Sequence, residues 1–120
     1  MSRKRPGQVR AGQHLRDHLT YRPRIRGLSS AAHAEVARVE TSRNHLYVGY
    51  TADAVRMWRN LVHNPYRRLW VEYEHDGCGV WQCCGSPFEA RTLLEAVIVG
   101  MSRRRARELR SLVDQLDDLY

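Results

Sequence analysis

Long hydrophobic runs are absent from this chain of 120 residues. No stretch approaches the roughly 20 apolar residues of a membrane-spanning helix, so we expect no membrane partner. The charged N-terminus, MSRKRPGQVR, is not followed by a hydrophobic stretch, and we expect no secretory signal. Cysteine is scarce too, and its three copies lie close together at positions 78, 83 and 84. An odd, local set of thiols is typical of a reducing compartment, so we expect a cytoplasmic protein.

Lysine is nearly absent, because Lys4 is the only lysine among 20 basic residues and the others are arginine. The formal net charge is +7. The planar guanidinium binds phosphate through a fork of donors, so this composition favours a nucleic-acid partner, DNA rather than RNA. A GC-rich genome, as in some bacteria and phages, is the alternative cause. The clustered candidates for nucleic-acid binding are Arg3, Arg5, Arg22, Arg24, Arg26, Arg59, Arg103, Arg104, Arg105 and Arg107.

The length predicts one domain, and a hydrophobic content of 42% is enough for a packed core. Residues 1–28 are strongly basic and interrupted by proline and glycine, which predicts a partly flexible N-terminal arm. Residues 29–120 then form a single domain.

Two β-hairpins are predicted within that domain. The first joins Ala34–Thr41, where charged and apolar residues alternate, to His45–Tyr50, which is rich in β-branched and aromatic residues. The second joins Arg68–His75, which alternates cleanly, to Val80–Cys84 across the turn "DGCG".

Three helices are predicted as well. Thr51 or Asp53 would cap the first, which ends before "NP" and buries Val55, Trp58, Leu61 and Val62. Ser86, followed by proline and then by Glu89, predicts a capped helix to Met101. The C-terminal helix covers residues 102–119 with a leucine-rich stripe. The order of elements predicts an α+β fold, with a small antiparallel sheet packed against two C-terminal helices.

Two short motifs carry a resemblance to a known family. "YVGYT" at Tyr47–Thr51 is followed by Arg56, and "SPFEARTLLEAVI" covers Ser86–Ile98. Over residues 35–100 the chain resembles the GIY-YIG nuclease domain, in which a Tyr-Val-Gly strand end precedes a helix with an arginine. The family's other tyrosine motif is missing, because Ala37 stands where its tyrosine is expected.

The resemblance implies a divergent endonuclease that uses Mg²⁺ or Mn²⁺. It would assign the metal to Glu95, with Glu89 as the alternative, and the phosphate to Arg56. Tyr47 would orient or deprotonate water, and Tyr50 or His45 would supply a base that Ala37 cannot. The residues by themselves allow other roles, such as an ion pair between Glu95 and Arg91 one helical turn away.

A second constellation is His75, Cys78 and Cys83, whose spacing is compatible with zinc but lacks a fourth ligand. We favour buried structural thiols over a zinc site.

An alternative function is a non-enzymatic interaction protein of the phage or plasmid type, such as an inhibitor of a host defence complex. It would bind an acidic partner through its basic surface, or dimerise through the C-terminal stripe Leu109–Leu119.

Overall fold

The computed structural model describes residues 24–44, 46–70, 81 and 85–120. Within these residues the chain forms four α-helices, one short 3₁₀ helix and no strand. The predicted α+β fold with an antiparallel sheet is therefore wrong, and the described part of the chain is helical. The helices are α2 (Ser30–Ser42), α3 (Tyr50–Val62), α5 (Pro87–Gly100) and α6 (Arg103–Asp117), and the 3₁₀ helix η1 is Arg67–Leu69.

The first predicted strand, Ala34–Thr41, lies inside α2. Ala32, Val36 and Val39 are buried, and spacings of four and three residues place them on one face of a helix. The Ser29 hydroxyl accepts a hydrogen bond from the Ala32 backbone N–H at 3.1 Å and caps the first turn. The apparent alternation thus came from charged residues on the solvent face of a helix.

Where the structure describes the other predicted strands, it has turns and helical residues in their place. Residues 46–49 form a turn into α3, and Gly49 has φ 93°, a left-handed conformation that favours glycine. Arg68 and Leu69 lie in η1, while residues 71–75 lie outside the described part. Trp81 is helical and accepts a hydrogen bond from the Gly85 N–H at 2.9 Å, while residue 80 and residues 82–84 lie outside the described part.

The predicted helices are confirmed. In α5 the Ser86 hydroxyl accepts a bond from the Glu89 N–H, and Pro87 occupies the first turn. The four apolar residues predicted for the buried face of α3 are buried. In α6 the core residues are Leu109, Val113 and Leu116, whereas Leu119 follows the helix end and is exposed. Most of the stripe predicted for dimerisation is therefore covered by the chain itself.

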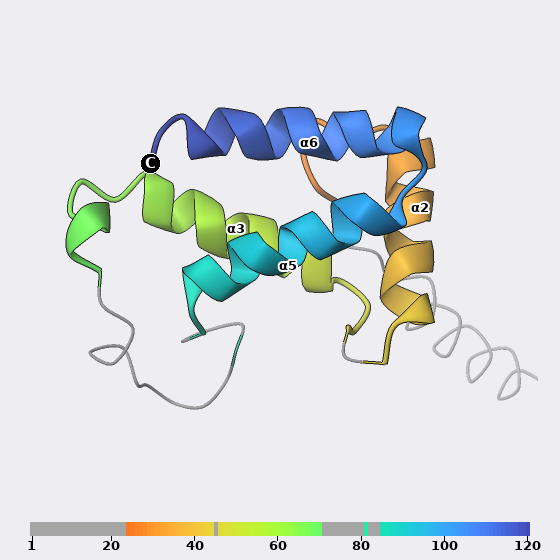
Figure 1. The fold of residues 1–120 in the computed structure, drawn as a ribbon, viewed down its shortest axis with the longest axis horizontal. Helices are drawn as coiled ribbons and strands as arrows, with labels where there is room; N and C mark the ends of the chain where they lie inside the picture. Colours follow the sequence, from red (N-terminus) through yellow and green to blue (C-terminus); the bar gives the residue numbers. More distant parts are fainter. Residues whose placement is uncertain (1–23, 45, 71–80, 82–84) are drawn as a thin grey trace, which may run out of the picture.

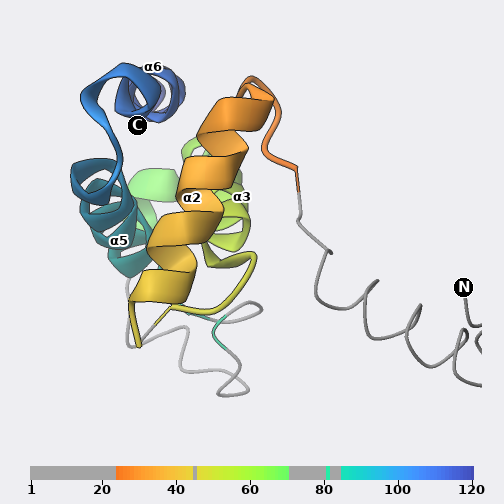
Figure 2. The same ribbon diagram turned by 90° about the vertical axis from the view of Figure 1, so that its right-hand side faces the viewer.

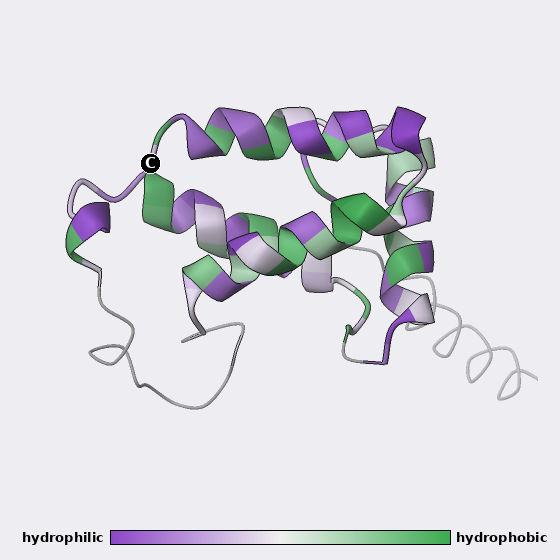
Figure 3. Ribbon diagram, viewed as in Figure 1, coloured by the Kyte–Doolittle hydropathy of each residue, from purple (hydrophilic) through white to green (hydrophobic). Residues whose placement is uncertain are grey.

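The helices pack in two directions. Figure 1 shows α3 and α5 crossing each other, with α6 running lengthwise above both and α2 standing steeply at one end. Figure 2, turned by 90°, places α2 in front of α3 and α5. A Cβ on Gly100 would lie 3.2 Å from both Val39 methyl groups, so glycine permits the close approach of α2 and α5. Hydrophobic residues recur along α6, whose ribbon is otherwise hydrophilic (Figure 3).

The N-termini of α2 and α6 are joined by a reciprocal pair of carboxylates. Glu108 of α6 accepts bonds from the Ser29 N–H and hydroxyl, both at 2.9 Å. Glu35 of α2 accepts bonds from the Ser102 N–H and hydroxyl, both at 2.7 Å. These bonds hold the pKa of each carboxyl below its ordinary value. A glutamate near each helix start also offsets the unfavourable arginines in the first turn of α6.

A third glutamate caps the start of α3. Glu40 is 3% exposed, and its carboxylate accepts bonds from the Gly49 N–H at 3.2 Å and the Thr51 N–H at 2.8 Å. The expected caps, Thr51 and Asp53, do not perform this role, because no side chain of α3 itself caps the helix. α3 therefore begins where α2 supplies a carboxylate.

Most of the predicted N-terminal arm, residues 1–23, lies outside the described residues. Its last part packs onto the core, where Ile25 and Leu28 are buried. In the described ranges, no helix combines the length and the apolar character needed to span a bilayer.

Candidate anion-binding cleft

Four arginines line one cleft with a volume of about 310 Å³. Arg24 and Arg26 come from the segment that precedes α2, and Arg56 and Arg59 come from α3. α3 places the latter two on one face because they are three residues apart. Apolar atoms of Ile25, Ala52 and Val55 complete the lining.

Among the described residues that line the cleft, Asp53 is the only carboxylate. It accepts a hydrogen bond from the Tyr47 hydroxyl at 2.6 Å and lies 3.6 Å from a guanidinium nitrogen of Arg56. Within the described part of the chain, no acidic side chain forms an ion pair with Arg24, Arg26 or Arg59. The cleft therefore carries a positive charge that suits an anion with several oxygens.

The two tyrosines considered as bases, Tyr47 and Tyr50, stay protonated. Burial and the hydrogen bond to Asp53 raise the pKa of Tyr47 well above its ordinary value. Burial raises the pKa of Tyr50 to about 12, with a smaller contribution from Glu89. Both phenols keep their protons at neutral pH, so neither is suited to deprotonate water there.

Tyr47 and Tyr50 belong to an aromatic cluster. Tyr50 stacks on Trp81 with ring centres 4.7 Å apart, and the Tyr47 ring packs edge-on at 5.3 Å from Tyr50. Tyr47 remains 37% exposed, and its hydroxyl binds Asp53, which belongs to the lining of the cleft. This ring could thus contact a ligand that enters the cleft.

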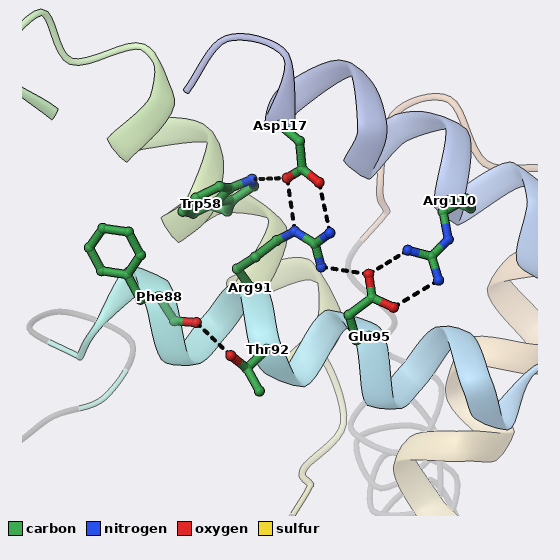
Figure 4. A network of polar contacts seen from close by, with 7 residues as sticks. All are labelled: Trp58, Phe88, Arg91, Thr92, Glu95, Arg110 and Asp117. Carbon is green, nitrogen blue, oxygen red and sulfur yellow. Dashed lines mark hydrogen bonds and ion pairs between the residues drawn. The ribbon is translucent and has the colours of Figure 1, made fainter. Parts of the chain in front are cut away.

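Glu95, the predicted metal ligand, lies in a different set of contacts. It joins α5 to α6, where Arg110 binds its carboxylate through two guanidinium nitrogens (Figure 4). Arg91 donates to the same carboxylate at 2.8 Å. The bond from Arg110, followed by that from Arg91, lowers the pKa of Glu95 to about 2. The ion pair with Arg91, one of the roles that the sequence allowed, is present.

Arg91 also reaches the end of α6. Its guanidinium makes two bonds to Asp117, at 2.8 and 2.7 Å, and the Trp58 indole N–H donates to the same carboxylate at 2.9 Å. The bonds to Asp117 are the main cause that raises the pKa of Arg91. This network, Trp58–Asp117–Arg91–Glu95–Arg110, fastens α3, α5 and α6 together (Figure 4).

The three residues predicted for the nuclease site, Tyr47, Arg56 and Glu95, therefore do not share one set of contacts. Tyr47 and Arg56 meet at Asp53, which the sequence interpretation missed, whereas Glu95 binds Arg91 and Arg110. Among the described residues, no group of three or more His, Cys, Asp or Glu side chains could hold a metal ion. The alternative ligand Glu89 lies exposed in the first turn of α5.

The remaining candidates have mixed surroundings. On α6, Arg103, Arg104 and Arg107 are exposed, and Arg105 pairs with Glu108 at 3.3 Å. Several candidates lie outside the described residues, namely Arg3, Arg5, Arg22, His45 and the zinc candidates His75, Cys78 and Cys83.

Comparisons with known protein families, with curated proteins and with solved structures found no match. The GIY-YIG resemblance thus depends on short motifs alone, and in this fold the letters "YVGYT" form a turn and the start of a helix.

Proposed function

We propose that this protein binds a nucleic-acid strand through the four-arginine cleft. The observation that carries the proposal is that Arg24, Arg26, Arg56 and Arg59 line one cleft. Guanidinium groups bind phosphate oxygens by paired, charge-assisted hydrogen bonds, and a run of phosphates offers several such partners.

A single strand suits the cleft better than a rigid duplex. A volume of about 310 Å³ is at the lower end of ligand pockets, so one phosphate-sugar unit can enter it. A flexible strand can insert such a unit and present a base to the exposed Tyr47 ring.

The proposal includes no metal and no cleavage. Both oxygens of Glu95 are occupied by arginines, and Tyr47 and Tyr50 hold their protons. Endonuclease activity stays a prediction, which incubation of plasmid DNA with the protein and Mg²⁺ or Mn²⁺ would test by nicking.

Binding is tested by fluorescence anisotropy with a labelled DNA single strand, the RNA of the same sequence and the DNA duplex. The test variant is Arg56→Gln with Arg59→Gln. The matched control is Arg103→Gln with Arg104→Gln, which removes the same charge from the exposed start of α6. We expect the test variant to weaken single-strand binding about tenfold or more, and the control to weaken it only about twofold.

Equal losses in both variants would show that overall charge, rather than the cleft, determines binding. An absence of binding to all three nucleic acids would refute the proposal and favour the alternative of an acidic protein partner.

A further inference from the structure

The segment that brings Arg24 and Arg26 to the cleft is tied to the ring of His33. The Ile25 backbone N–H donates to His33 Nε2 at 2.9 Å. On the other side of the ring, Nδ1 lies 2.8 Å from the Ser29 carbonyl oxygen. The first contact bridges the turn that precedes α2, which Figure 2 shows beside the start of that helix, and the second lies within the first turn of α2.

These two bonds allow only one form of the imidazole. A backbone N–H can only donate, so Nε2 must carry a lone pair, and a carbonyl oxygen can only accept, so Nδ1 must carry the proton. A protonated ring would direct a second N–H at the Ile25 N–H. The segment is therefore held by neutral His33 and would be released by the imidazolium.

Among the residues that the structure describes, few charged groups face the His33 ring. Glu40 lines the same small cavity, of about 20 Å³, but its carboxylate already accepts bonds from the start of α3. From α6, Glu108 binds Ser29, and those bonds keep the pKa of Glu108 below its ordinary value, so it stays charged in mild acid. On the segment itself, Arg24 and Arg26 flank Ile25 and stay charged throughout.

We propose that His33 is a positioning residue whose neutral ring keeps Arg24 and Arg26 in the cleft, so that nucleic-acid affinity falls as the pH falls. This inference rests on the proposed function, because it describes the regulation of the same cleft. Histidine changes its charge between about pH 5 and pH 8, which is the range in which the affinity should respond.

The sign of the effect separates this proposal from simple electrostatics. A histidine that gains a proton near a basic site adds positive charge and strengthens the attraction for phosphate. Release of the segment acts in the opposite direction, because two of the four lining arginines leave.

The affinity for the labelled single strand is measured from about pH 8 to about pH 5.5, and we expect it to weaken about tenfold. In His33→Gln, the amide oxygen can replace Nε2 as an acceptor for Ile25 but does not titrate. We expect this variant to bind equally well across the range. The control is His63→Gln, at the exposed end of α3, which should keep the pH dependence.

An affinity that is constant or rises in acid, or a pH dependence that survives in His33→Gln, would overturn the proposal. The nitrogen NMR spectrum of the histidine rings supplies a readout that needs no ligand. At about pH 8 we expect His33 to carry its proton on Nδ1. A proton on Nε2 refutes the role of His33 even if binding occurs, whereas an absence of binding with the expected ring form refutes only the proposed function.

Discussion

Two groups of arginines in this molecule have opposite surroundings. At the junction of α5 and α6, Arg91 and Arg110 are bound by the carboxylates of Glu95 and Asp117. At the cleft, four arginines line one surface, and Asp53 is the one carboxylate among the described lining residues. One side-chain type thus fastens helices in the first region and gathers positive charge in the second.

The comparison shows that residue type alone does not determine what an arginine does. Arginine close to carboxylates contributes to the free energy of unfolding, whereas arginines that crowd together oppose folding slightly and favour an external anion. Matched substitutions in the two regions should therefore affect different measurements.

The largest effect on stability is expected from Asp117→Asn. This change removes the charge that holds Arg91 and weakens the acceptor for the Trp58 indole. We expect the free energy of unfolding, measured with urea, to fall by about 2 kcal/mol, because charge-assisted bonds in a partly buried site are weakened. Nucleic-acid affinity should not change. A loss of affinity with unchanged stability would reverse the roles of the two regions.

A smaller effect on the free energy of unfolding is expected when the pH is lowered. The pKa of Glu95 in the folded protein, about 2, lies below the ordinary value of 4.5. The charged carboxylate therefore stabilises the fold fully above pH 4.5, and this stabilisation is lost as the pH falls from 4.5 towards 2. The side chain is 39% exposed, and solvent screening reduces the contribution to about 1 kcal/mol. The stability difference between the wild type and Glu95→Gln should vanish by about pH 2.

The exposed Glu89 on the same helix provides the control for that experiment. If Glu89→Gln showed the same pH-dependent difference, the network would not be its cause.

The smallest effect is expected from Asp53→Asn, the counterpart of Asp117→Asn in the cleft. It removes the one carboxylate among the described lining residues and, with it, the ion pair between Asp53 and Arg56. We expect the affinity for the single strand to rise about threefold, while the free energy of unfolding changes by less than about 0.5 kcal/mol. A weaker affinity would mean that Asp53 is needed to orient Arg56.

Local signals in the sequence were enough to predict α3, α5 and α6. The Ser86–Pro87 start and the apolar stripes act within one or two helical turns, so they can be read without the fold. Val36 and Val39 were misread because a short run of valines and charges is compatible with either a strand or a helix.

The capping glutamates could not be predicted, because each depends on another helix. Glu108 and Ser29 are 79 residues apart, and Glu40 meets the start of α3 only through the turn at Gly49. Likewise, the cleft arginines were candidates one by one. Their convergence depends on the burial of Ile25 and Leu28, which places the N-terminal segment beside α3.

The central claim is that the cleft, rather than the whole basic surface, binds the nucleic-acid strand. Its most direct test is the salt dependence of single-strand affinity for the wild type and for a variant with all four lining arginines changed to glutamine. We expect the slope of the logarithm of affinity against that of salt concentration to decrease by about 2 to 3 units, with the unfolding free energy unchanged. An unchanged slope in a folded variant would contradict the account.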